Sequence, residues 1–211
     1  MCNWRDLFKN TKIIPVVIID NADHALPLAD AILKGGINVI EITLRTKAAF
    51  EAIDRIKNHY SEIRVGAGTV VTERDATRAI DAGVDFGLAP GLSPETVAIF
   101  QQADCLFIPG VMTASEIEKA YALGCNLLKF FPAEQAGGAH MLKALAAPYA
   151  HLDIYFCPTG GINLSNMSDY LVLPAVAAIG GSWIANEEEL ATESWDVITD
   201  NVRQALRYIP S

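Results

Sequence analysis

Gly-Ile-Asn-Val-Ile-Glu, at residues 36–41, is the first of three related stretches in this sequence. It returns as Gly-Val-Asp-Phe-Gly-Leu at residues 83–88 and as Gly-Cys-Asn-Leu-Leu-Lys at residues 124–129. Each stretch begins with a glycine suited to end a helix in the left-handed conformation, and each continues as a strand in the same register. The three stretches therefore predict a repeating unit in which a helix leads into a strand.

Short apolar runs alternate with longer amphipathic stretches along the whole chain. Ser93 before Pro94 predicts one helix start, and Thr-Ala-Ser-Glu at residues 113–116 predicts another through a capping box. Eight strands, each followed by a helix, predict an α/β fold of the (β/α)8 or TIM-barrel kind, preceded by a short N-terminal helix. The expected strands are residues 13–19, 39–44, 64–70, 86–89, 106–109, 127–131, 154–158 and 176–179.

A doubly wound open sheet is the alternative fold. Such a sheet usually carries a phosphate loop after its first strand, but residues 19–23, Ile-Asp-Asn-Ala-Asp, contain no glycine. In a barrel, the inward side chains of alternate strands share a layer, so we expect Glu41, Leu88 and Lys129 to lie at similar depth. An acid and an amine would then meet inside an otherwise apolar lumen.

Composition narrows the class of protein. The 211 residues are 51% hydrophobic and no linker divides them, so we expect one domain over residues 1–211. A formal net charge of -9 disfavours a nucleic-acid partner, and no apolar run reaches the roughly 18 residues of a membrane span. The N-terminal residues lack the apolar region of a signal peptide. Four cysteines without a CxxC motif favour free thiols and a cytoplasmic location.

Lys129 lies in the sequence Leu-Leu-Lys-Phe-Phe-Pro at residues 127–132. Strand alternation puts Leu127, Lys129 and Phe131 on one face, and Leu128 and Phe130 on the face that meets the outer helices. Lys129 then points into the lumen, although lysine is seldom buried unless it is paired. A Schiff base needs the neutral amine, which an apolar pocket favours over the ammonium ion. The structural alternative is a packed lysine stem whose amine reaches water or a carboxylate.

Strand 2 places Glu41, Thr43 and then Arg45 on one face. An entirely polar inner face is costly to bury without partners, so it indicates a site. We predict that Glu41 moves protons as a general acid and base. Arg45 lies nearer the carboxyl end of the strand, and its forked guanidinium suits a substrate carboxylate. A structural ion pair of Glu41 with Lys129 or Arg45 is the alternative.

Glycines mark the carboxyl ends of three expected strands. Gly-Ala-Gly-Thr at residues 66–69 lets the backbone approach a ligand and adds a hydroxyl. Pro-Thr-Gly-Gly at residues 158–161 and Gly-Gly-Ser at residues 180–182 end neighbouring strands, where barrels commonly bind phosphate through backbone N–H groups. Two tight turns are the alternative explanation for the last pair.

The sequence contains no close pair of metal ligands. His24, His59, His140 and His151 form no HExxH motif, and we expect all four to be solvated in helices or loops. We therefore expect no metal and no other cofactor.

Seven segments resemble the family of 2-keto-3-deoxy-6-phosphogluconate aldolase, also named 4-hydroxy-2-oxoglutarate aldolase, and they occur in order across nearly the whole chain. Single motifs among them are common, but the combination is highly specific. The segments are Ile-Glu-Ile-Thr-Leu-Arg-Thr (40–46), Val-Gly-Ala-Gly-Thr-Val (65–70), Ala-Pro-Gly-Leu (89–92), Ile-Pro-Gly-Val (108–111), Leu-Lys-Phe-Phe-Pro-Ala-Glu (128–134), Phe-Cys-Pro-Thr-Gly-Gly-Ile (156–162) and Ile-Gly-Gly-Ser-Trp (179–183).

The resemblance implies a class I aldolase that forms a Schiff base on Lys129 and uses Glu41 as acid and base. It implies cleavage of 2-keto-3-deoxy-6-phosphogluconate into pyruvate and D-glyceraldehyde 3-phosphate, in a homotrimer without metal. The remaining implied residues are Arg45 and Thr69 for the pyruvate carboxylate, Pro90, Phe131 and Thr159 for the pocket wall, and Gly160, Gly161, Gly181 and Ser182 for the phosphate. The sequence departs from some relatives by having Ile18 where they have an arginine in strand 1.

Two other functions remain open at this point. One is a Schiff-base aldolase for an unphosphorylated or C4-epimeric keto acid. The other is a non-catalytic barrel that binds a sugar phosphate, although the joint presence of Glu41, Arg45 and Lys129 argues against it. The substrate epimer, the pathway and the oligomeric state do not follow from the residues alone.

Overall fold

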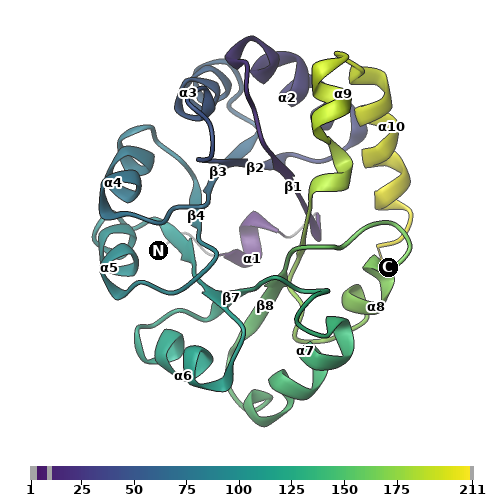
Figure 1. Cartoon of the computed structure of the whole chain (residues 1–211). Helices are drawn as coiled ribbons and strands as arrows, with labels where there is room; N and C mark the ends of the chain where they lie inside the picture. The colour runs from purple at the N-terminus through teal and green to yellow at the C-terminus, as the bar shows by residue number, and fades with distance from the viewer. Residues whose placement is uncertain (1–3, 9–10, 210–211) are drawn as a thin grey trace.

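A closed barrel of parallel strands, ringed by helices, forms the body of the protein (Figure 1). The computed structural model describes residues 4–8 and 11–209. The strands are β1 (Ile13–Val17), β2 (Val39–Thr43), β3 (Arg64–Gly68), β4 (Phe86–Leu88), β5 (Leu106–Ile108), β6 (Gly110–Val111), β7 (Leu127–Phe130), β8 (Tyr155–Pro158) and β9 (Ile179–Gly181).

The first helix is seen within the ring, and the other helices follow the strands on its outside (Figure 1). Their bounds are α1 (Trp4–Leu7), α2 (Ala25–Gly35), α3 (Ala49–His59), α4 (Glu73–Asp81), α5 (Pro94–Gln102), α6 (Ala114–Ala122), α7 (Gly138–Ala146), α8 (Met167–Leu171), α9 (Glu187–Ala191) and α10 (Trp195–Leu206), with short 3-10 turns η1 (Ala22–His24), η2 (Ala147–Tyr149) and η3 (Ser182–Ile184). The predicted (β/α)8 barrel with a short N-terminal helix is confirmed.

Two ladders of strands meet at two junctions to close the barrel. One has the order β5-β4-β3-β2-β1-β9 and the other β6-β7-β8. Pro109, which has no N–H, separates β5 from β6, and its carbonyl accepts a hydrogen bond of 2.8 Å from the N–H of Lys129. A parallel bridge between Thr159 and Gly180 joins β8 to β9. β5 and β6 thus occupy one strand position in a barrel of eight.

The local signals for helix ends are confirmed. The Ser93 side chain accepts a hydrogen bond from the N–H of Thr96, and α5 begins at Pro94. Thr113 and Glu116 form the reciprocal capping box at the start of α6. The glycines that open the three related stretches, Gly36, Gly83 and Gly124, have φ angles of 106°, 69° and 81°. Only glycine adopts that left-handed backbone without steric cost, which explains why the stretches begin as they do.

Six predicted strands differ from the structure by one or two residues at one end, and the fifth and the last differ more. The fifth strand does not stop at Pro109, because Gly110 and Val111 pair with β7 as β6. The last strand is Ile179–Gly181 and not residues 176–179, since Ile179 and the two glycines pair with Ile13, Ile14 and Pro15 of β1. Glycines at positions that look like a turn were in fact strand residues.

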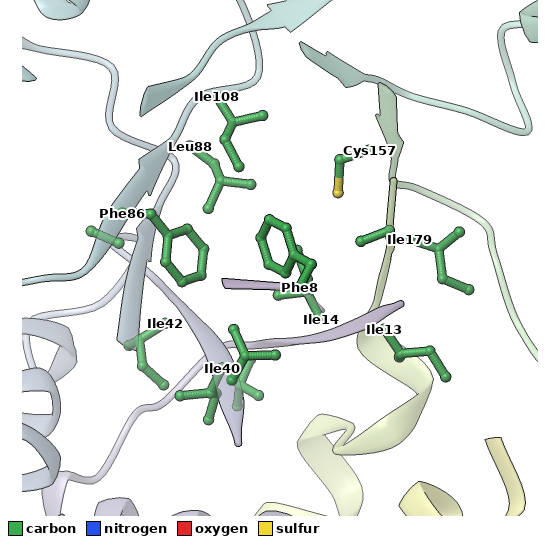
Figure 2. Close-up of a cluster of buried hydrophobic side chains, with 14 of the residues drawn as sticks. Phe8, Ile13, Ile14, Ile40, Ile42, Phe86, Leu88, Ile108, Cys157 and Ile179 are labelled. Atoms are coloured by element: carbon green, nitrogen blue, oxygen red, sulfur yellow. The ribbon is translucent and has the colours of Figure 1, made fainter. Parts of the chain in front are cut away.

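An apolar plug closes the amino end of the barrel. Phe8, which follows α1, is 4% exposed, and its ring lies 5.9 Å from that of Phe86 in β4. Figure 2 shows Phe8 amid the buried cluster, with Phe86, Leu88 and Cys157 around it. The barrel therefore has a filled amino end, and open space for a ligand has to lie toward the carboxyl ends of the strands. Among the described residues, no helix is both long and apolar enough to cross a membrane.

Candidate active site

A cavity of about 220 Å³ opens at the carboxyl ends of the strands. Ten of the eleven residues predicted for the site line it, and Gly181 is the exception. Its wall also includes Val16, Ile18 and Ile162, which the sequence did not assign to the site. Thr43 and Gly180 line it as well, and the sequence had placed them on the inward face of strand 2 and in the Gly-Gly-Ser motif. Strand periodicity could have found Val16, because it lies on the inward face of β1.

Lys129 and Glu41 meet inside this cavity. The Lys129 Nζ lies 3.3 Å from Glu41 Oε1, and the two residues are 5% and 1% exposed. They come from β7 and β2, so the shared depth predicted for them is confirmed, and Leu88 is buried in the core without lining the cavity. A charge-assisted N–H···O bond is usually 2.7–2.9 Å long, so this contact is looser than an ion pair built for stability.

Gly68 leaves the space in which the Glu41 carboxylate lies. A Cβ atom built at Gly68 would lie 2.0 Å from Glu41 Oε1. The side chain of Glu41 therefore crosses the neighbouring strand β3 at a position where any larger residue would push it away. This explains the second glycine of the Gly-Ala-Gly-Thr motif, which the sequence attributed to close approach of a ligand.

Two buried oxygens of the cavity have no hydrogen-bond partner among the described residues. They are Glu41 Oε2 and the Thr43 hydroxyl, and Thr43 is 4% exposed. Both side chains come from the inward face of β2 and both line the cavity. Leaving a buried polar atom unpaired costs free energy, so the pair points to a polar molecule bound between them.

Arg45 lies at the rim of the cavity, just after β2 ends, and is exposed. Its N–H donates to the carbonyl of Thr43 over 2.8 Å, and the Thr46 hydroxyl donates to the carbonyl of Ile19 in the turn after β1. The turn that carries the guanidinium is therefore tied to two strands. A cation held at the mouth of an otherwise closed cavity is suited to bind the carboxylate of an entering acid.

Thr69 follows β3 with a φ angle of 61°. A β-branched residue rarely adopts this left-handed conformation, which costs of the order of 1–3 kcal/mol. The strain occurs where the chain lines the cavity, next to the Glu41 cradle at Gly68. Strain at such a place is typical of a residue held in position for a ligand.

Pro90, Phe131 and Thr159 form the wall, as the resemblance implied. The Phe131 ring centroid lies 5.5 Å from the Lys129 Nζ, so the ring covers one side of the amine. The Thr159 hydroxyl donates to the carbonyl of Cys157 over 3.4 Å. A Cβ at Gly180 would lie 2.5 Å from the Thr159 Oγ1, so that glycine makes room for the threonine.

The two glycine loops lie together on the β8–β9 side of the cavity. Gly160 and Gly161 have φ angles of 102° and 77°, and the Gly161 carbonyl accepts a hydrogen bond of 3.1 Å from Asn166 Nδ2. Gly181 is buried against the Trp183 ring, where a Cβ would lie 1.7 Å from a ring carbon. Gly180 and Ser182 form the cavity wall at this point instead.

Cys157 lies beneath the paired charges. It is Cα-paired with Lys129 across β7 and β8 and is fully buried. Burial raises the pKa of this thiol to about 12, although the nearby Lys129 acts in the opposite direction. The thiol is thus neutral at physiological pH and belongs to the floor of the site as an apolar group.

The histidines are distant from one another, and one of them was predicted wrongly. His59, His140 and His151 are exposed, but His24 is half-buried, with its ring 5.6 Å from that of Trp195. This contact depends on α10 packing beside η1, which no local pattern encodes. Within the described part of the chain, no group of three His, Cys, Asp or Glu side chains could hold a metal ion.

Comparisons with known proteins agree with this geometry. The model of the KDPG and KHG aldolase family matches residues 5–201. A 2-dehydro-3-deoxy-phosphogluconate aldolase of Haemophilus influenzae is 42% identical over 95% of this chain and 94% of its own length. A KHG/KDPG aldolase of Escherichia coli K12 is 37% identical over 98% of each chain. A crystal structure of KDPG aldolase from Legionella pneumophila, with pyruvate captured at low pH as a covalent carbinolamine intermediate, has a TM-score of 0.90 and 41% identity over 94% of this chain and 96% of that chain.

Proposed function

Because the chain belongs to the KDPG and KHG aldolase family, and is therefore a carbon–carbon lyase, we propose that it cleaves 2-keto-3-deoxy-6-phosphogluconate through a Schiff base on Lys129. The products are pyruvate and D-glyceraldehyde 3-phosphate. We propose that it also cleaves 4-hydroxy-2-oxoglutarate, to pyruvate and glyoxylate. The observation that carries the proposal is the buried contact of 3.3 Å between the Lys129 amine and the Glu41 carboxylate at an open cavity.

The roles of the two residues follow from their chemistry. The neutral amine of Lys129 attacks the 2-keto carbon, and loss of water gives an iminium ion. This cation accepts the electron pair of the C3–C4 bond as that bond breaks. Glu41 takes the proton of the C4 hydroxyl and later returns a proton to C3 of the enamine. Its free oxygen Oε2 supports this role, since it has no partner among the described residues.

Substrate binding is proposed at the two ends of the cavity. Arg45 and Thr69 hold the pyruvate carboxylate, and Pro90, Phe131 and Thr159 enclose the carbon chain. The N–H groups of Gly160, Gly161, Gly181 and Ser182 bind the phosphate at the opposite end. Ile18 lines this cavity, and the basic side chains among the lining residues are Arg45 and Lys129. Phosphate affinity therefore depends on backbone donors.

The proposal extends to the cofactor requirement, the location and the oligomeric state of the enzyme. We propose that the enzyme needs no metal or other cofactor, because the Lys129 iminium supplies the electron sink. The free thiols of Cys125 and Cys157 support a cytoplasmic location. We propose a homotrimer, for which exposed apolar side chains such as Val71 and Met112 offer contact surface.

Reductive trapping tests the proposed function. Borohydride added in the presence of pyruvate should inactivate the enzyme and attach a label that peptide mass spectrometry locates at Lys129. The Lys129→Arg variant should give neither label nor cleavage, because a guanidinium stays protonated. A label on another residue, or none, would refute the Schiff base on Lys129. Cleavage of a panel of 4-hydroxy-2-keto acids before and after EDTA treatment tests the substrate and the metal independence together.

A further inference from the structure

Thr43 is a cavity residue with a polar side chain to which the proposed reaction gives no role. Its hydroxyl is nine-tenths buried and unpaired within the described residues, two positions after Glu41 on the same strand face. Valine has nearly the same shape and suits a strand as well as threonine does. A buried hydroxyl without a partner weakens the fold relative to valine, so its presence points to a polar molecule that it binds.

Thr43 lines the cavity, and its buried hydroxyl has no hydrogen-bond partner among the described residues. Its Cα is paired with Gly68 of β3, the glycine over which the Glu41 carboxylate lies. Residues two apart on a strand have their Cα atoms about 6.5–7 Å apart, a spacing that one water molecule can bridge between two side chains. Glu41 Oε1 is already engaged by Lys129, and the carboxylate oxygen left for such a bridge is Oε2.

We propose that Thr43 is a positioning residue whose hydroxyl, together with Glu41 Oε2, holds the water molecule that adds to the Lys129 imine. This inference rests on the proposed function. A carboxylate accepts hydrogen bonds only, so the water donates to Oε2, while the threonine hydroxyl can donate to the water oxygen or accept from it. Two fixed partners orient the water toward the carbon that Lys129 holds.

The step is hydrolysis of the pyruvate iminium. The water oxygen bonds to C2, the π electrons of the C=N bond move to nitrogen, and Glu41 takes one water proton, which gives a neutral carbinolamine. Glu41 then protonates the nitrogen, the C–N bond breaks with its electrons leaving on the amine, and the carbinolamine hydroxyl returns its proton to Glu41. Transfer of that proton from Glu41 to the amine restores the ammonium–carboxylate pair. The reverse sequence forms the imine.

The Thr43→Val variant distinguishes a role of Thr43 in positioning the water molecule from a structural role. The rate at which borohydride-trappable imine forms after pyruvate is added should fall roughly 10-fold to 100-fold, the equivalent of one lost hydrogen bond to a buried partner. The final trapped fraction should not change, because a positioned water alters the rate and not the equilibrium. The Tm should stay equal or rise, and Thr43→Ser, which keeps the hydroxyl, should recover most of the rate.

A matched control comes from a threonine whose hydroxyl is satisfied. Thr199 in α10 is buried, and its hydroxyl donates to the carbonyl of Ala31 over 3.0 Å. Thr199→Val should lower the Tm and leave the rate of imine formation unchanged. An unchanged rate in Thr43→Val, or a lowered Tm that Thr43→Ser restores without any change in rate, overturns the proposal. If wild-type enzyme traps no pyruvate at Lys129, the proposed function itself has failed.

Discussion

The two ends of the barrel are built in opposite ways. The amino end is closed by Phe8 against Phe86, and both rings are almost fully buried. The carboxyl end buries an amine and a carboxylate, leaves two oxygens without a partner among the described residues, and holds Thr69 in a strained conformation. The contact between the two rings is typical of a stable core. The cavity at the carboxyl end instead combines buried charges, unpaired oxygens and backbone strain, all of which lower the stability of the fold.

We infer from this difference that the amino end of the barrel contributes mainly to stability, and that the carboxyl end carries the chemistry. Unpaired buried oxygens and a strained threonine each weaken the fold by of the order of 1–3 kcal/mol. The apolar plug and the strand–helix core offset those costs from outside the cavity. Substitutions should therefore fall into two groups, one that alters rate with little loss of stability and one that alters stability with little loss of rate.

Glu41→Gln gives the largest expected change. Turnover should slow by roughly 10²–10⁴, the usual contribution of a positioned acid and base. Pyruvate should still bind to a large extent, since Arg45 and Thr69 are untouched, and isothermal titration measures this. If turnover stays near normal, Glu41 is only a structural partner of Lys129, and the carboxyl end is built for stability after all.

Phe8→Ala should lower the stability of the fold and leave turnover unchanged, the reverse of what we expect for Glu41→Gln. Removing a buried phenylalanine ring typically lowers the free energy of unfolding by about 3–5 kcal/mol. For a chain of this size each kcal/mol lowers the Tm by about 2–4 °C, which a thermal melt detects easily. Turnover well below the melting range should be unchanged. Phe8→Leu is the control, with a smaller fall in Tm, and a large loss of turnover in either variant would break the separation between the two ends.

The site was more predictable from sequence than the plug, for a physical reason. Strand alternation fixes which side chains face inward, and a lysine and a glutamate inside an apolar barrel can only be explained by each other or by a ligand. Phe8 gives no such signal, because one aromatic residue after a short helix can pack anywhere. Its position depends on α1 folding under the barrel, which is a tertiary event.

Glycine was the residue whose meaning sequence reasoning judged least well. Gly180 and Gly181 suggested a phosphate-binding loop at the end of the last strand, but they are strand residues that leave room for Thr159 and Trp183. Gly68 suggested close approach of a ligand, but it accommodates the Glu41 side chain. In each case the side chain that fills the space comes from a residue that the local pattern does not identify.

Ser182→Asp tests the phosphate end of the cavity with a smaller expected effect. Ser182 is exposed at the start of η3, so a carboxylate fits there without clashing. Gly161 is a poorer choice, since its φ is 77° and a Cβ would lie 2.7 Å from the Glu134 Cβ. Repulsion between a carboxylate and a phosphate at short range is about 1–4 kcal/mol. We expect kcat/KM for the phosphorylated six-carbon acid to fall about 10-fold to 100-fold.

The shorter substrate provides the comparison for this variant. Cleavage of 4-hydroxy-2-oxoglutarate should change little, because its chain ends before Ser182. Ser182→Asn, which is similar in size but neutral, should affect both substrates only slightly. Equal losses for the two substrates in Ser182→Asp would mean that the loops are scaffold and that the phosphate binds elsewhere.

The smallest effect is expected from Glu116, which lies outside the cavity just beyond β6. Hydrogen bonds from the N–H of Met112, then from the hydroxyl and N–H of Thr113, hold the pKa of its carboxyl below the ordinary value of 4.5. A lowered folded pKa means that the carboxylate stabilises the fold above about pH 4.5, and that this contribution is lost as the pH falls through the lowered value. Glu116→Gln should therefore reduce the free energy of unfolding by about 1 kcal/mol at pH 7, the usual magnitude of a helix cap, with no change in turnover.

Urea unfolding at several pH values should show that the free energies of unfolding of the wild type and Glu116→Gln converge at acid pH. Glu73→Gln, at the same end of α4 but outside any capping box, should show a smaller difference. A loss of turnover in Glu116→Gln would show that chemistry at this end reaches beyond the cavity wall.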